Sequence, residues 1–154
     1  ASPMQPQVGV TWFNALQLCL RRGMRLPTEY EWEWAARGPE LPIFPWGNVF
    51  VPEYVVSIPD DTVTYDVGTI PENISWAGVY DLVGNAGEWV EDRPLPYSNE
   101  IESQFRQSIL DTHRVVRGGS YTSNILFVNN VARETVDPRS GGGIGFRCAQ
   151  SAQP

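Results

Sequence analysis

Proline is concentrated in the middle of this 154-residue chain and limits the structures that the middle can form. Between Gly38 and Glu72 the prolines are Pro39, Pro42, Pro45, Pro52, Pro59 and Pro71. Proline lacks an amide hydrogen and clashes with the preceding turn of a helix, so this stretch excludes a long helix. It predicts long irregular loops, and loops of this length in a compact domain usually carry a function or a bound ion.

A first helix is predicted before the prolines, over residues 11–22. Thr11 is suited to cap its first turn, and Gly23 is suited to end it in a left-handed conformation. Apolar residues follow near helical spacing. The buried face is expected to hold Phe13, Leu16, Cys19 and Leu20.

A second helix is predicted over residues 28–37. Thr28 and Glu31 have the spacing of a capping box, and Gly38 follows the last turn. Trp32, Ala35 and Ala36 are expected to share its buried face.

Short segments of alternating polarity follow the loops, at 79–82, 113–116, 130–136 and 144–148. Such segments favour short antiparallel strands joined by structured loops. With two helices near the N-terminus, they predict an α+β domain.

Four motifs occur in order along the chain. They are RLPTEYEWEWAARG (25–38), GVYDLVGNAGEWVED (78–92), RVVRGGSY (114–121) and IGFRCA (144–149). This order resembles the formylglycine-generating-enzyme-like family, also called the sulfatase-modifying-factor family, over about residues 10–149. The resemblance implies a C-type-lectin-like fold. It also implies that residues 1–154 form a single domain that corresponds to the C-terminal part of the family domain. Another chain or segment would then complete its N-terminal side.

The two cysteines, Cys19 and Cys148, have two interpretations. Unpaired cysteine is among the most buried residue types, so both can be free thiols in the core. In the resembled family, cysteines at the matching positions can form a disulfide. That bond would indicate an oxidising, extracytoplasmic compartment, whether periplasmic, surface or secreted.

The family's oxidases bind copper through a cysteine pair shortly after the GGSY motif. By alignment, Ser123 and Val128 occupy those two positions. Neither side chain replaces a thiolate, which is the ligand that selects Cu(I). We therefore expect no copper and no formylglycine generation by that route. The sequence also offers a single histidine, His113, whereas the family's iron-dependent members need several.

Charged side chains near the motifs are interpreted as structural. Arginines such as Arg117 and Arg147, when buried in loop-rich folds, commonly pair with acids or donate to carbonyls. Glu29, Glu31 and Glu33 alternate around the second helix, and Glu31 is the cap partner, so they do not indicate acid–base catalysis.

A calcium site is the metal site that the resemblance supports, in the loop 83–88. Calcium prefers six to eight oxygen ligands, which a glycine-rich turn can supply through its carbonyls. Glu88 is the expected side-chain ligand, with the carbonyls of Val83, Gly84 and Ala86. The alternative is a tight turn in which Glu88 is solvated or bonded to backbone amides.

The polar stretch between Tyr121 and Gly143 is the expected ligand-binding surface, since adaptable polar residues with a few apolar ones are typical of binding loops. The candidate residues are Tyr121, Ser123, Asn124, Phe127, Asn129 and Asn130. We favour a non-catalytic interaction domain for a protein or glycan partner. An oxidoreductase that uses another site or a further domain is the first alternative. A variable display protein of a diversity-generating retroelement is the second.

The composition excludes two other classes of partner. The net charge is −7 and all eleven cationic residues are arginine, without a basic stripe, so a nucleic-acid partner is not expected. No apolar run approaches the ~20 residues that span a bilayer, so no transmembrane segment is expected.

Overall fold

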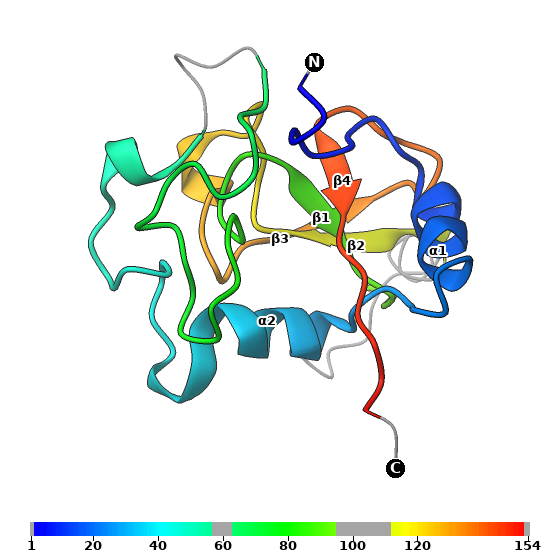
Figure 1. Ribbon diagram of the computed structural model, residues 1–154, viewed down its shortest axis with the longest axis horizontal. Coiled ribbons are helices and arrows are strands. Elements are labelled where there is room, and N and C mark those ends of the chain that lie inside the picture. The colour runs from blue at the N-terminus through cyan, green and yellow to red at the C-terminus, as the bar shows by residue number, and fades with distance from the viewer. Residues whose placement is uncertain (1, 57–62, 95–111, 153–154) are drawn as a thin grey trace, which may run out of the picture.

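The computed structural model describes residues 2–56, 63–94 and 112–152 (Figure 1). Two helices, α1 (Trp12–Leu20) and α2 (Glu29–Arg37), come first. The strands are β1 (Gly87–Trp89), β2 (Arg114–Arg117), β3 (Arg133–Val136) and β4 (Ile144–Phe146). Three 3-10 turns, η1 (Gly38–Glu40), η2 (Pro52–Tyr54) and η3 (Ile125–Phe127), interrupt the loops. Helix α2 runs below the sheet in Figure 1, and α1 lies at its right-hand side.

Helix α1 begins where the sequence predicts, because the Thr11 hydroxyl accepts a hydrogen bond from the Asn14 amide at 3.2 Å. Its buried face differs from the prediction. The buried residues are Trp12, Ala15 and Cys19, whereas Phe13 and Leu20 are exposed. The indole of Trp12 decides the orientation, since it donates to the Val90 carbonyl at 2.8 Å inside the core.

Helix α2 has the predicted capping box. The Thr28 hydroxyl accepts from the Glu31 amide at 3.2 Å, and the Glu31 carboxylate accepts from the Thr28 amide at 2.9 Å. Arg25 also donates to both Glu31 oxygens at 2.6 Å, and this pair holds the Glu31 pKa at about 2. Trp32 and Ala36 are buried as predicted, while Ala35 is half-buried.

The four strands form one mixed sheet in the order β3-β2-β1-β4. Strands β1 and β2 pair antiparallel, as do β2 and β3, but β1 and β4 pair parallel. The prediction missed β1, and it expected mostly antiparallel strands without identifying the parallel pair. Three residues are too few to display alternation, and a parallel partner more than fifty positions away leaves no local signal. The predicted strand at 79–82 is wrong, because this segment contributes one bridge, Ile74 to Tyr80.

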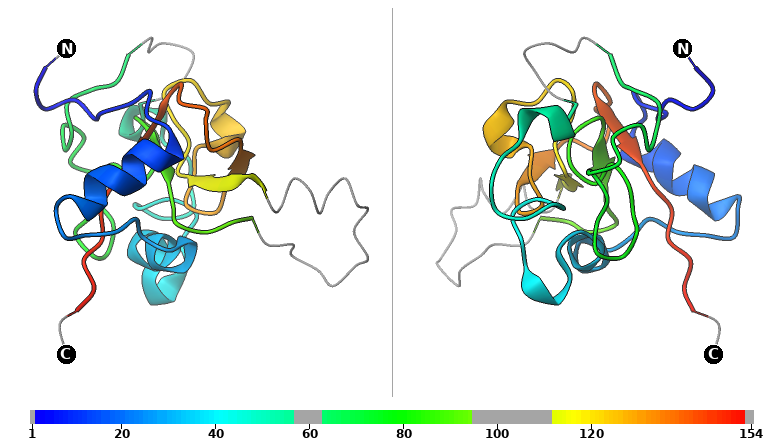
Figure 2. Two further views of the ribbon diagram at one scale, coloured as in Figure 1. Left: turned by 90° about the vertical axis from the view of Figure 1, so that its right-hand side faces the viewer. Right: turned by 60° about the vertical axis from the view of Figure 1, so that its left-hand side comes forward.

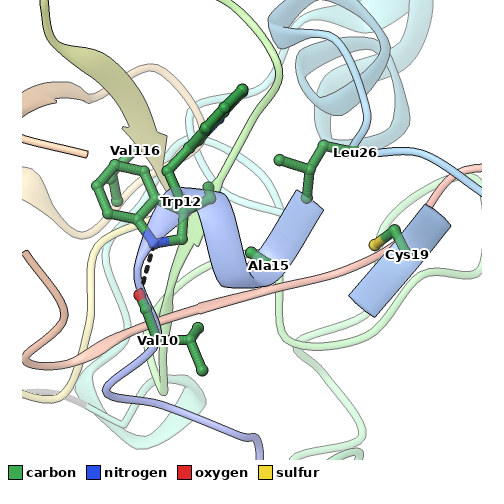
Figure 3. Packing of buried hydrophobic residues seen from close by; sticks show 7 residues of the cluster. Val10, Trp12, Ala15, Cys19, Leu26 and Val116 are labelled. Carbon is green, nitrogen blue, oxygen red and sulfur yellow. Dashed lines mark hydrogen bonds between the residues drawn. The ribbon is translucent and has the colours of Figure 1, made fainter. Parts of the chain in front are cut away.

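The core consists of neighbouring apolar clusters, and the largest joins α1 to the sheet (Figure 3). Its buried members are Val10, Trp12, Ala15, Cys19, Leu26, Trp89 and Val116. Cys19 and Cys148 form a disulfide, with Cα atoms 5.5 Å apart, which confirms the family-like pairing. The bond ties α1 to the segment after β4, where Arg25 and Ala149 also exchange two backbone hydrogen bonds.

No helix in the described ranges is both long and apolar enough to cross a membrane.

Candidate functional site

Glu88, the expected calcium ligand, lies in β1 with its side chain 8% exposed. Arg147 donates to both of its oxygens, at 2.6 Å from Nε and 2.5 Å from Nη2. The indole of Trp32 donates a third hydrogen bond at 2.7 Å. Burial opposes the charge on Arg147, but the pair with Glu88 prevails and raises the Arg147 pKa. The carboxylate is therefore satisfied by protein donors.

The rest of the loop, residues 83–86, is a buried turn. Its oxygen atoms are not arranged to bind calcium. The Val83 carbonyl accepts from the Asn73 amide group at 2.6 Å. Asn85 holds a left-handed conformation, and its side chain exchanges two hydrogen bonds with the Tyr65 backbone. A calcium ion bound to Glu88 would also meet the positive charge of Arg147. Calcium at this loop therefore stays a prediction, and Glu88 would have to release Arg147 to serve it.

A cleft of about 340 Å³ adjoins this ion pair and contains one acid that the sequence analysis did not identify. Asp81 lines the cleft with Tyr80, Glu88 and Arg147. Burial raises the Asp81 pKa, although the Gly68 amide donates to its carboxylate at 2.7 Å. Within the part of the chain that the structure describes, no three His, Cys, Asp or Glu side chains gather to share a metal.

Arg117 is the centre of a second ion-pair network and is 1% exposed. It donates to Glu33 at 2.8 Å and to Glu29 at 3.4 Å, both from α2. It also donates to the carbonyls of Asn130 and Val131, each at 3.0 Å. Arg117 therefore fixes α2, β2 and the start of the segment before β3 to one another, which is the structural role that the sequence analysis assigned.

The expected ligand surface spans residues 121–143; together with Ser120, which lines the same cleft, it is called the 120–143 face. Three of its candidate residues, Ser123, Asn124 and Phe127, line a cleft of about 460 Å³. Tyr121 is half-buried, and its amide donates to the Asn85 carbonyl at 3.0 Å. It does not line the cleft.

The other two candidates have structural roles. Asn130 was a wrong prediction, because it is 0% exposed and its side chain donates to the carbonyls of Ala36 and Pro42 at 3.5 and 3.4 Å. The Asn129 side chain accepts from the amides of Val131 and Ala132 at 2.9 and 2.7 Å and so closes a local turn. Asparagine suits a turn as well as a binding loop, and composition alone does not distinguish them.

Ser123 and Val128, the two residues aligned with the copper-binding cysteines, lie in different surroundings. Val128 is 0% exposed and packs in an apolar cluster with Phe44, Val55 and Val83. The Ser123 hydroxyl accepts from the Ser120 amide at 3.0 Å. A buried aliphatic side chain and a bonded hydroxyl do not fit a copper ion, which needs soft donors.

Turn η3 lies between these two positions and exposes apolar side chains. Ile125, Leu126 and Phe127 are 37%, 76% and 50% exposed. The right-hand view of Figure 2 shows η3 at the edge of the molecule. The buried Val128 anchors this turn, so its exposed residues are presented on a fixed support.

With this geometry, the chain is a C-type-lectin-like domain of the type found in formylglycine-generating enzymes. The family model for the "Sulfatase-modifying factor enzyme 1-like domain" matches residues 1–152. The chain belongs to this family.

Known relatives include active and inactive proteins. The chain is 36% identical to an inactive C-alpha-formylglycine-generating enzyme 2 of Bos taurus, over 96% of this chain and 50% of that protein. It is 33% identical to a formylglycine-generating enzyme of Bos taurus, over 99% of this chain and 46% of that protein. The chain thus spans about half the length of the curated relatives it matches.

Among solved structures, variable protein 1 of Treponema denticola superimposes with a TM-score of 0.72, covering 95% of this chain and 71% of that one. At 19% identity, this likeness concerns the fold alone.

Several residues of the 460 Å³ cleft were not among the predicted site residues. Ser120, Thr122, Glu134 and Ser140 line it together with the glycines 141–143. Glu134 carried a usable signal, because it alternates with Arg133 in β3 and the two side chains must point to opposite faces of the sheet. Arg133 pairs with Glu29 at 2.7 Å, on the side of α2.

Proposed function

We propose that this chain is a non-catalytic interaction domain that binds a protein or glycan partner through the 120–143 face. The fold that it shares with the family provides the scaffold. The segment that contains Ser123 and Val128, which matches the copper-binding segment of the oxidases, provides the contact surface. An extracytoplasmic location accords with the disulfide, since such bonds persist in oxidising compartments.

The observation that carries this proposal is the orientation of residues 125–128. Val128 fills the core where a metal-binding thiolate would have to be free, and the three residues before it expose their apolar side chains. Contiguous apolar side chains on a surface are typical of an interaction site. Exposed aliphatic side chains favour a protein over a glycan, which presents mostly hydroxyl groups.

A first experiment tests the absence of catalysis. The chain is incubated with a sulfatase-type peptide, Cu(I) and oxygen, and the peptide is analysed by mass spectrometry. We expect its cysteine to remain unmodified. Turnover above a control without protein would favour the alternative, an oxidoreductase that uses a different site or a further domain.

A second experiment tests binding through η3. Peptides are selected by phage display on the wild-type chain, and glycans are screened on an array in parallel. Enriched ligands should lose binding to Phe127→Ser and Leu126→Ser. They should keep binding to Val49→Ser, a matched change at a 73% exposed apolar residue outside the face. Equal binding to all variants would contradict the proposed surface.

Calcium at the loop 83–88 is tested by chelation. If Glu88 binds calcium, a chelator should lower the melting temperature of the wild type and leave Glu88→Ala unaffected. If the pair with Arg147 is the resting arrangement, the chelator should change neither. The ion-pair geometry favours the second result.

A second contact surface, for another chain or segment, is proposed on α1. Phe13 and Leu20 are 50% and 57% exposed on α1, beside the face that buries Trp12, Ala15 and Cys19. A partner that packs on α1 should protect the two side chains from solvent, which site-specific labelling of Phe13→Cys can measure.

A further inference from the structure

The 460 Å³ cleft in the 120–143 face lies between β3, the loop 120–124 and the glycine turn 141–143. Its volume is in the range of ~300–1,000 Å³ that is typical of small-ligand sites. Among the residues that line it, Glu134 is the one with an ionisable side chain. The remaining lining consists of hydroxyls, an asparagine, glycines and apolar side chains.

Glu134 is directed into the cleft by the pleat of β3. It is opposite Val116 in the register of β2, and Val116 and Val136 line the same cleft. Arg133, on the other face of the strand, points to α2 and pairs with Glu29. The sheet therefore separates the acid from the nearest arginine on its own strand.

The carboxylate of Glu134 is half-buried and has no hydrogen bond or ion pair with any residue that the structure describes. The other partly buried glutamates in the described ranges all pair with arginines, and Glu31 pairs with Arg25. Glu29, Glu33 and Glu88 pair with Arg117, Arg133, Arg37 or Arg147. Burial raises the pKa of Glu134, and no cation among the described residues offsets the effect. An unmatched buried charge costs free energy, which a cationic ligand would recover.

The wall facing Glu134 is preformed. The Ser120 hydroxyl is 2.9 Å from that of Thr122 and 3.2 Å from that of Ser123. A β-carbon at Gly143 would lie 2.9 Å from the Ser120 and Thr122 hydroxyl oxygens, so a side chain there would displace these hydroxyls. These hydroxyls satisfy one another and keep lone pairs that can accept from a ligand donor.

We infer that the cleft receives the cationic side chain of a protein partner, with Glu134 as its counter-charge and the Ser120 and Thr122 hydroxyls as further acceptors. The inference rests on the proposed function and specifies the chemistry of the partner. Leu126 and Phe127 would contact apolar residues next to the cation, because Phe127 lines the same cleft. A neutral sugar would leave the carboxylate unmatched, and an anion would be repelled by it.

The test uses two peptides that differ in one charge. They are acetyl-Leu-Arg-Leu-amide and the same peptide with citrulline, a neutral isostere of arginine. Each is titrated into the isotopically labelled chain and followed by NMR. We expect the arginine peptide to bind about tenfold more tightly, in keeping with a charge-assisted hydrogen bond. The affected amides should be those of residues 120–124 and 141–143.

Two variants complete the experiment. Glu134→Gln should remove the preference for arginine, whereas Glu72→Gln, which removes an exposed charge elsewhere, should keep it. Unchanged spectra with both peptides, equal affinity for both, or a preference that survives Glu134→Gln would each overturn the inference. Ligands that depend on Phe127 without preferring a cation would overturn it while leaving the proposed function standing.

Discussion

The domain treats its partly buried acids in two opposite ways. Beside α2 and β1, Glu29, Glu33 and Glu88 each accept from a buried or half-buried arginine, so these charges are neutralised within the domain. On the 120–143 face, Glu134 has no partner among the described residues. One side of the scaffold thus has its partly buried carboxylates paired, and the other side has one that is not paired. A cationic ligand would gain the most binding free energy at the unpaired carboxylate.

Apolar side chains show the same difference. Val128 is 0% exposed and packs with Val83, while Leu126, two residues earlier, is 76% exposed. The first residue stabilises the scaffold, and the second is available to a partner. The buried residues and ion pairs outside the 120–143 face are called the frame. Substitutions in the frame should therefore cost stability, and substitutions on the 120–143 face should leave stability unchanged or improve it.

The largest loss is expected when the disulfide is removed from the frame. Replacing Cys19 and Cys148 with alanine frees a loop of 129 positions in the unfolded chain. The free energy of unfolding should fall by about 4–5 kcal/mol in the entropy model. Urea titration without reductant measures the difference. Adding reductant should lower the free energy of unfolding of the wild type toward that of the variant and leave the variant unchanged. A variant as stable as the wild type would mean that the disulfide does not stabilise the fold.

Arg117→Met should give the next largest loss, because it removes a buried donor to Glu29, Glu33 and two backbone carbonyls. Glu29 keeps its pair with Arg133, and Glu33 keeps its pair with Arg37. We expect a loss of about 3 kcal/mol, the lower end for a broken buried pair. The glutamates keep 21% and 36% of their side chains exposed, so water relieves part of the cost. Chemical denaturation is the measurement.

The matched control is Arg139→Met. Arg139 pairs with Asp137 at 2.6 Å, but its side chain is 81% exposed. Its removal should leave the unfolding midpoint unchanged, since exposed ion pairs contribute little. Equal losses at both arginines would contradict the role given to burial.

The sequence predicted the parts of the fold that depend on neighbouring residues. The capping box of Thr28 and Glu31 is local, and so is the Thr11 cap, and both helices begin as predicted. The Cys19–Cys148 pair came from the family resemblance. Strand β1 and its parallel partner β4 depend on contacts between distant segments, which no local pattern records.

The site was predicted less completely for the same reason. Ser123, Asn124 and Phe127 could be grouped from the sequence because they follow a recognisable motif, and they line one cleft. Glu88 was assigned to calcium because its partner, Arg147, is 59 positions away and was interpreted separately. Glu134 was overlooked because its isolation appears only when the neighbours of β3 are known.

Thr28→Ala tests a smaller contribution to the frame. The change removes the hydroxyl that accepts from the Glu31 amide and should cost about 1 kcal/mol. Glu31 would keep its two hydrogen bonds from Arg25, which limits the loss. Thr28→Ser keeps the hydroxyl and should remain close to the wild type in thermal unfolding. A serine variant as unstable as the alanine variant would mean that the methyl group, not the cap, matters.

The smallest effect, and the one of opposite sign, is expected at Glu134. Its pKa in the folded chain is raised above the ordinary value of 4.5, so the folded state holds the proton more tightly than the unfolded chain. The contribution of Glu134 to the free energy of unfolding therefore falls as the pH rises from 4.5 through the raised pKa. At neutral pH its charge opposes folding. Glu134→Gln should raise the melting temperature slightly at neutral pH and match the wild type at a pH well below 4.5. The difference between the two melting curves across pH isolates this group from other acids, with Glu72→Gln as the control for net charge. A glutamine variant that is less stable at neutral pH would mean that Glu134 stabilises the fold. A variant that is more stable but no longer prefers the arginine peptide would mean that the charge serves binding at a cost in stability.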